Sequence, residues 1–173
     1  MDLAKYIRDI PDYPKKGIMF KDIMPLCEDG EAFRHAVKEL ADLFKDTKAD
    51  AIVAAEARGF IFGAALAYKL KLGFVAVRKP GKLPYRQRRV TYDLEYGQDS
   101  LCIHEDALKP GMKAIVIDDL LATGGTVGAM CKLVEEAGAK VAGVGFLIEL
   151  DFLHGRDKLR NYRVESLIHY AGE

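Results

Sequence analysis

Runs of apolar residues along the chain indicate short buried strands. Four runs consist of Ala, Val, Ile, Leu, Phe and Gly alone, at 51–55, 73–77, 114–117 and 141–148. Strands covered on both faces in a parallel sheet have this continuous apolar composition. The mixed stretch 164–168, Val-Glu-Ser-Leu-Ile, would form a late strand. Gly143 and Gly145 inside the fourth run predict a close approach by another part of the chain.

Apolar residues at helical spacing lie between the predicted strands. The clearest helix spans 31–45, with one apolar side made of Phe33, Val37, Leu40 and Phe44. Further helices are predicted after Gly59 and from Gly125 to about Glu136, where Gly138 would end the second one. Leu3, Ile7 and Ile10 predict a short amphipathic helix over 3–10. Strands alternating with helices predict an α/β fold with a mostly parallel central sheet flanked by helices.

Composition and charge narrow the possible functions. The chain has 173 residues, which predicts a single domain over 1–173, and its formal net charge is zero. No overall field therefore attracts it to nucleic acid or a membrane surface. No apolar run is long enough to span a bilayer, and the N-terminus lacks the apolar core of a signal peptide. Three scattered cysteines form no metal or disulfide pattern, so we expect a cytoplasmic protein with reduced thiols.

The strongest chemical motif follows the third predicted strand. Two adjacent carboxylates, Asp118 and Asp119, stand where that strand should end, and the loop Ala122-Thr123-Gly124-Gly125-Thr126 leads into a helix. Glycines let backbone N–H groups approach an anion closely, and a helix start adds unpaired N–H groups and partial positive charge. The carboxylates would repel a phosphate, so they need a different partner. A ribose 5-phosphate carries both the phosphate and a vicinal diol that would donate to them.

Cations follow two other strands at the same predicted edge of the sheet. Arg58 lies in the charged loop after the first strand, and six cations without an acid occur between Arg78 and Arg89. Ligands bind open α/β sheets at the carboxyl ends of their strands, so both loops are candidate anion sites. From the residues alone, Arg58 could also be a surface cation and the run a solvated loop.

The 114–126 stretch resembles the phosphoribosyl pyrophosphate (PRPP) motif of the type I phosphoribosyltransferases. Its Asp-Asp-Leu-Leu-Ala-Thr-Gly-Gly-Thr sequence is similar to the version in adenine phosphoribosyltransferases, as are the Arg-Lys-x-Gly-Lys pattern from Arg78 and the Leu-Glu-Tyr-Gly tetrad at 94–97. The 114–126 stretch is neither a Walker A loop nor a dinucleotide-binding glycine motif. The resemblance implies the type I fold, with an N-terminal hood over about 11–27, a flexible hairpin lid over about 78–103 and a non-proline cis peptide near Arg58.

The resemblance also implies a role for each site residue. Ala122, Thr123, Gly124, Gly125 and Thr126 would bind the 5-phosphate, and Asp118 and Asp119 would hold the ribose diol. The pyrophosphate would contact Arg58, Arg78, Lys79 and Lys82. Adenine would lie against Met19, Phe20, Lys21 and Leu120, with Glu95 as the proton-transfer residue. Without the resemblance, we would interpret the segment 17–23 as a connector and Glu95 as an exposed strand residue.

The implied reaction is adenine plus PRPP giving AMP and pyrophosphate, a pentosyl transfer of purine salvage. Mg²⁺ would enter bound to PRPP rather than in a protein site of its own. The resemblance implies a homodimer, with no nucleic-acid or membrane partner. Two alternatives stay open: transfer to another base, such as xanthine, hypoxanthine or orotate, and a non-enzymatic PRPP sensor that regulates transcription or RNA.

Overall fold

Five parallel strands form the central sheet of the computed structural model, which describes residues 1–94 and 97–172. In spatial order the strands are β4 (Gly73–Val77), β3 (Ala51–Ala55), β7 (Lys113–Leu121), β8 (Lys140–Leu150) and β9 (Val164–Tyr170). All four pairings are parallel, so the carboxyl ends of the strands meet at one edge. The predicted α/β fold and its late strand are confirmed.

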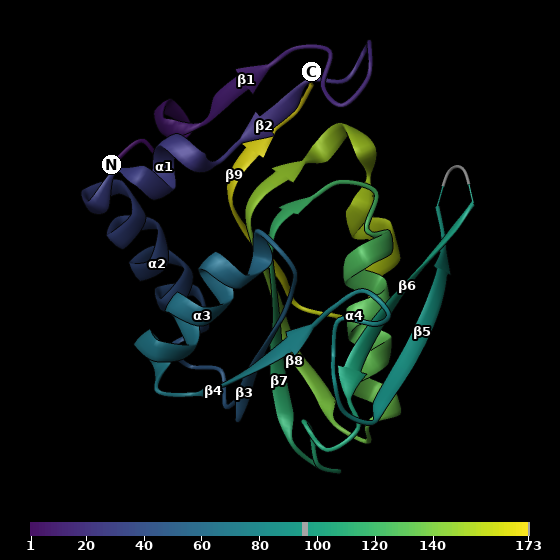
Figure 1. The fold of residues 1–173 in the computed structure, drawn as a ribbon. Coiled ribbons are helices and arrows are strands. Elements are labelled where there is room, and N and C mark those ends of the chain that lie inside the picture. The colour runs from purple at the N-terminus through teal and green to yellow at the C-terminus, as the bar shows by residue number, and fades with distance from the viewer. Residues whose placement is uncertain (95–96, 173) are drawn as a thin grey trace.

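Helices cover both faces of the sheet (Figure 1). On one face lie α1 (Met24–Glu28), α2 (Gly30–Phe44) and α3 (Gly59–Leu70), and on the other lies α4 (Gly125–Glu136) with the antiparallel hairpin of β5 (Gln87–Asp93) and β6 (Gln98–His104). The Asp29 carboxylate accepts from the amides of Glu31 and Ala32 and so caps α2. The three longer helices match their predictions, and no helix of the described residues could cross a membrane.

The two glycines inside β8 allow α2 to pack closely against the sheet. A Cβ placed on Gly143 or Gly145 would come within 2.7 Å of the Phe44 ring. Phe44 itself is fully buried at the end of α2. The close approach predicted from these glycines is therefore confirmed, and it fixes α2 against the strand that leads to the site.

The N-terminal segment differs from its prediction. A 3-10 helix, η1, covers only Leu3–Tyr6, and residues Arg8–Ile10 form strand β1, which pairs antiparallel with β2 (Phe20–Asp22). The helix predicted over 3–10 is wrong, because a helix this short has little stability of its own and the backbone of 8–10 gains a strand partner. That partner lies ten residues further on, beyond the reach of local periodicity.

Only one end of the hairpin within the predicted lid at 78–103 belongs to the core. Val90, Leu101 and Ile103 are at most 4% exposed and pack in the same cluster as Val127 and Met130 of α4. By contrast, Leu94 near the hairpin turn is 46% exposed. Any lid movement would therefore involve the outer end of the hairpin, while its base stays packed against α4.

Candidate active site

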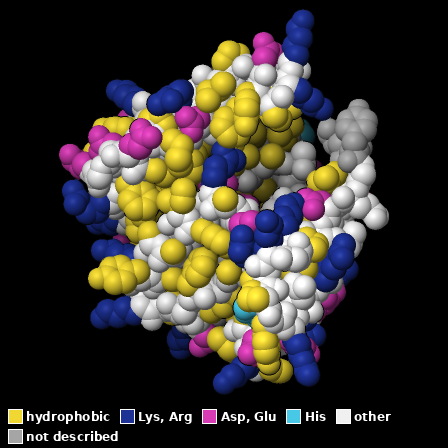
Figure 2. Space-filling view, in the orientation of Figure 1, with side chains coloured by type: hydrophobic (Ala, Val, Ile, Leu, Met, Phe, Trp, Pro, Cys, Tyr) yellow, Lys and Arg dark blue, Asp and Glu magenta, His cyan; other side chains and the backbone are white. Residues whose placement is uncertain are grey.

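The loops at the carboxyl edge of the sheet enclose a cavity of about 820 Å³, here called the sheet-edge cavity. Figure 2 shows this side of the molecule hollowed near its centre, with basic and acidic side chains beside the hollow. The cavity is lined by Glu56, Ala57, Arg58, Asp93, Leu94, the continuous stretch 118–127 and Lys158. The carboxylate pair, the predicted phosphate loop and Arg58 are thus brought together.

Asp118 and Asp119 stand near the end of β7, in the middle of the sheet. Asp118 is partly exposed, whereas Asp119 is 5% exposed. Asp119 donates its amide to Asp118 Oδ1 at 2.9 Å, and its Oδ2 lies 2.9 Å from Arg58 Nε. A Cβ on Gly59 would come within 2.7 Å of Asp118 Oδ1, so a glycine is needed where α3 begins.

The two carboxyl groups hold their protons more tightly than ordinary aspartates. Burial and the neighbouring Asp119 charge raise the pKa of Asp118 well above its usual value. Burial also raises the pKa of Asp119, although the Arg58 guanidinium opposes this shift. Asp119 Oδ2 forms only the ion pair with Arg58 Nε, which lacks hydrogen-bond geometry, and Arg58 Nη1 has no hydrogen-bond partner among the described residues; both atoms are buried. A ligand with a donor for the first and an acceptor for the second would complete the site.

The predicted phosphate loop wraps around the start of α4. Gly124 precedes the helix with a φ of 80°, a left-handed conformation that favours glycine. The first amides of α4, from Gly125 onward, have no acceptor within the helix and face the cavity edge. The Tyr92 hydroxyl of β5 lies 3.4 Å from Thr126 Oγ1, so the hairpin contacts the loop directly.

The other predicted pyrophosphate cations lie beside the cavity rather than in its lining. The Glu56 carboxylate, which does line it, accepts from Arg78 Nη2 at 3.2 Å and from the Lys79 amide at 2.7 Å. Lys79 Nζ is paired with Asp99, and Lys82 donates its amide to the Lys79 carbonyl. Arg58 is itself paired with Asp119. Apart from Lys82, each cation predicted to meet pyrophosphate is held by a carboxylate.

Of the residues predicted to bind the base, only Leu120 lines the cavity. Phe20 is close by, because the Arg58 guanidinium lies 4.8 Å from the centre of its ring and Tyr13 packs edge-on against it. Met19 precedes Phe20 and is partly buried. Lys21 turns its side chain away, to Asp9 at 2.8 Å and over the Tyr170 ring at 4.0 Å. Glu95 lies outside the described residues.

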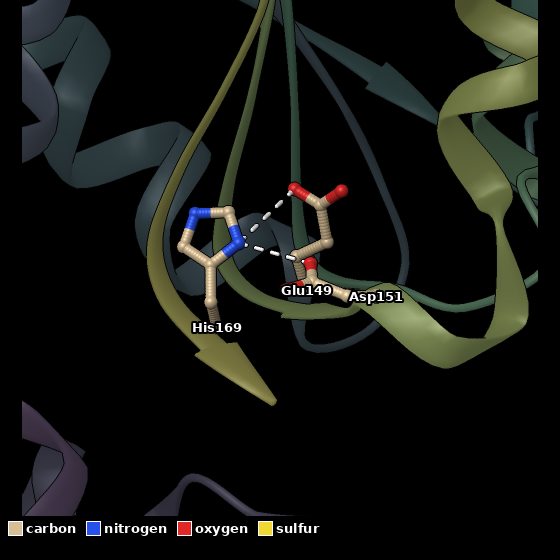
Figure 3. A group of neighbouring side chains, drawn as sticks. All are labelled: Glu149, Asp151 and His169. Carbon is tan, nitrogen blue, oxygen red and sulfur yellow. Dashed lines mark hydrogen bonds and ion pairs between the residues drawn. The ribbon is translucent and has the colours of Figure 1, made fainter. Parts of the chain in front are cut away.

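A second group of ionisable side chains lies where β8 meets β9. His169 Nδ1 is 2.9 Å from Asp151 and 3.9 Å from Glu149 (Figure 3). Three such side chains can hold a metal ion, but Glu149 already accepts from Arg156 at 2.6 and 2.8 Å and from Ser166 at 2.6 Å. The group is an ion-pair network with its central carboxylate filled, not an open metal site.

Several lining residues were absent from the predicted set. Glu56 and Asp93 add acids, and Lys158 adds a cation from the 3-10 helix η3 (Gly155–Leu159). Glu56 had a detectable signal, since it begins the same charged loop as Arg58. Lys158 had none, because it stands in a polar segment more than thirty residues after the phosphate loop.

Comparison with known proteins agrees with this geometry. The phosphoribosyl transferase domain model matches residues 28–170. A Solidesulfovibrio magneticus protein named adenine phosphoribosyltransferase is 61% identical over 171 residues, covering 99% of this chain and 100% of the relative.

Solved structures give the same picture. The adenine phosphoribosyltransferase of Thermoanaerobacter pseudethanolicus superposes with a TM-score of 0.96 at 53% identity, over 98% of both chains. The Saccharomyces cerevisiae enzyme, solved with an imino-altritol bisphosphate and adenine, superposes with a TM-score of 0.88 at 40% identity over 94% of both chains.

Proposed function

The chain belongs to the adenine phosphoribosyltransferase family, and on that basis we propose that the sheet-edge cavity transfers phosphoribose from PRPP to adenine. The bond from ribose carbon 1 to pyrophosphate breaks, the bond from carbon 1 to adenine N9 forms, and N9 loses its proton. One observation carries the proposal. A pair of carboxylates, of which Asp119 is buried, and the start of helix α4 line the same cavity, which fits a ligand that carries a diol and a phosphate.

The 5-phosphate binds at the start of α4. Amides of 124–126 and the hydroxyls of Thr123 and Thr126 supply donors, and the helix adds partial positive charge. This contact lies away from the reacting carbon, so its binding energy positions that carbon rather than acting on the bonds that change. The ribose diol donates to Asp118 and Asp119, and Asp119 Oδ2 is a buried acceptor without a hydrogen-bond donor among the described residues.

The carboxylates also act on the transition state. Carbon 1 gains positive charge as pyrophosphate leaves, and fixed negative groups near the ribose stabilise that charge. Because the pKa values of Asp118 and Asp119 are raised, a fraction of these carboxyl groups is protonated at lower pH. Activity therefore rises with pH until both carboxylates are ionised.

Pyrophosphate is received by Arg58, Arg78, Lys79 and Lys82. Three of these cations form ion pairs with Asp119, Glu56 and Asp99 in the ligand-free protein. Pyrophosphate therefore replaces these carboxylates as the partner of the cations. Mg²⁺ enters as part of the substrate, on the PRPP oxygens. The preference of Mg²⁺ for substrate phosphates over all-protein sites supports this route.

Adenine lies between Phe20 and Leu120, with the backbone of Met19 and Lys21 reading its edge. The position of Phe20 against Arg58 supports this placement, because the ring then adjoins the cation proposed for the leaving group. Glu95 is proposed as the acceptor of the N9 proton on the sequence resemblance alone. A homodimer in the cytoplasm is likewise our expectation from that resemblance.

An assay with separate bases tests the function. The protein would be incubated with PRPP, Mg²⁺ and one of adenine, hypoxanthine, xanthine or orotate, and nucleotide and pyrophosphate would be measured. We expect AMP with adenine and little product otherwise. A preference for another base would reject the adenine assignment, and PRPP binding without any product would favour a sensor.

Two variants test the residue roles. Asp118→Asn combined with Asp119→Asn should abolish turnover while circular dichroism shows a folded protein, and near-normal activity would reject the diol assignment. For Glu95→Gln, a full kcat would remove Glu95 from proton transfer.

A further inference from the structure

One cation in the cavity lining is not used by the mechanism above. Lys158 is exposed, and no carboxylate pairs with it among residues 1–94 and 97–172. The other lining cation, Arg58, is held by Asp119. Four acids also line the cavity: Glu56, Asp93, Asp118 and Asp119. A substrate with several negative charges that enters this acidic cavity needs a cation that is not already paired with a carboxylate.

The segment that carries Lys158 is fixed against the phosphate loop. A Cβ on Gly124 would come within 2.6 Å of the Gly155 carbonyl oxygen, and one on Gly155 would collide with the Ala122 carbonyl oxygen. Leu159 is 1% exposed and lies in the same core cluster as Val127 and Met130 of α4. The residues on both sides of Lys158 in η3 are therefore held close to the loop and to its helix.

An ion pair with a buried carboxylate holds the same segment from its other side. Arg156 donates two hydrogen bonds to Glu149, which is 3% exposed, and a third to the Val164 carbonyl at 2.9 Å. Figure 3 shows Glu149 where the end of β8 lies beside β9. Because Arg156 spans both strands, η3 is anchored to the sheet and its lysine reaches the cavity from a defined base.

We infer that Lys158 binds the 5-phosphate of the substrate, as the side-chain cation of a subsite otherwise made of backbone amides and hydroxyls. This inference rests on the proposed function. A lysine on a flexible stem suits this position, since it meets a phosphate as a point charge without a fixed geometry.

The topology assigns Lys158 to the 5-phosphate rather than to pyrophosphate. The segment containing η3 connects β8 to β9, on one side of β7. Arg78, Lys79 and Lys82 follow β4, the edge strand on the opposite side of β7. The glycine contacts place η3 directly on the 122–124 backbone. The two groups of cations therefore approach the cavity from opposite sides.

The reverse reaction separates the two phosphate subsites, because AMP carries the 5-phosphate and pyrophosphate is a separate substrate. We expect Lys158→Gln to raise the KM for AMP about tenfold, the effect of losing one charge-assisted contact. The KM for pyrophosphate should stay within about twofold. Lys158→Arg, which keeps the charge, should restore most of the AMP affinity. Lys140→Gln is the matched control, an exposed lysine where β8 begins, at the other edge of the sheet.

A binding measurement without turnover completes the test. Calorimetry with ribose 5-phosphate should show weaker binding to Lys158→Gln by a similar factor and unchanged binding to the Lys140 control. Unchanged AMP and ribose 5-phosphate affinities would overturn the inference, as would an equal or larger effect on pyrophosphate. If the wild type converts adenine and binds ribose 5-phosphate, and Lys158→Gln has the same KM for AMP and the same affinity for ribose 5-phosphate, only the inference about Lys158 fails. If the wild type neither converts adenine nor binds ribose 5-phosphate, the proposed function fails.

Discussion

Asp118 and Asp119 place two like charges side by side in a partly buried site. Folding brings them out of water and leaves Arg58 as the neighbouring cation. The raised pKa values measure the unfavourable energy of ionising them in the folded protein. The carboxylate pair that we propose for the ribose diol therefore lowers the stability of the ligand-free fold.

Removing one of these charges should stabilise the protein at neutral pH. When folding raises the pKa of a carboxyl group, the protein's free energy of unfolding falls as the pH rises from the pKa of the unfolded chain, near 3.8, through the raised pKa of the folded protein. Asp118→Asn removes this loss but keeps the Oδ1 acceptor. We expect its free energy of unfolding to exceed that of the wild type by on the order of 1 kcal/mol at pH 8. Urea unfolding at pH 4 and pH 8 measures this, and an equal difference at both values would contradict it.

The Arg156–Glu149 pair has the opposite effect on stability. Arg156→Gln leaves the buried Glu149 carboxylate without its cation; because the Arg156 side chain is itself 45% exposed, we expect a cost of about 1–2 kcal/mol, below that of a fully buried pair. For a chain of this size that lowers Tm by roughly 2–8 °C. Arg160→Gln is the control, since both members of its pair with Asp157 are exposed. Calorimetric Tm values that fall equally for both variants would argue against a special role for the buried carboxylate.

Among the elements, η3 acts as a support for the phosphate loop. Gly155→Ala would force the Ala122 carbonyl and Leu121 side chain to move, at about 1–3 kcal/mol. We expect a higher KM for PRPP and an unchanged KM for adenine. Gly128→Ala is the matched control, because nothing lies within 4 Å of its added Cβ and alanine favours the helix. Steady-state kinetics with each substrate varied in turn provides the comparison.

Elements with a strong local pattern could be predicted from the sequence. Strands buried on both faces, such as β3 and β8, have continuous apolar runs, and α2 has a regular apolar side. The motif at the end of β7 identified the carboxylate pair and the predicted phosphate loop, because one short stretch contains all of these groups. Parallel strands then place Arg58 beside them.

Features that depend on contacts between distant segments could not be predicted. β1 forms only because β2 pairs with it, and Lys158 reaches the cavity only because η3 packs against α4 and Glu149. The acids that hold Arg78 and Lys79 come from the loop after β3 and from strand β6, so these pairings cannot be predicted from the local sequence. Each of these features depends on contacts between segments that are distant in the sequence.

At the scale of the whole molecule, the N-terminal segment and the end of the chain are joined at one place. Figure 1 shows the C-terminus beside β1 and β2. Lys21 of β2 is 5% exposed and bridges Asp9 of β1 to the Tyr170 ring of β9. Through β2, this contact fixes the position of the neighbouring Phe20.

Lys21→Met should therefore act on the base and not on PRPP. The variant loses the ion pair and the cation–π contact, which together contribute about 1–2 kcal/mol. We expect the KM for adenine to rise several-fold with the KM for PRPP unchanged. Lys16→Met, an exposed change in the same segment, serves as the control. A rise in both KM values would show a general loss of folding rather than a displaced Phe20.

The common direction of the five strands has a consequence for how this protein could be altered. Under the proposed function, each recognition task falls on a separate segment: the N-terminal strands for the base, the loop after β7 for the sugar phosphate, and the loops after β3 and β4 for the leaving group. Because these segments lie in or beside the cavity and come from different parts of the chain, a segment could be exchanged with that of a relative without rebuilding the others. New base specificities could thus arise by recombination near the N-terminus while the phosphate chemistry is inherited intact.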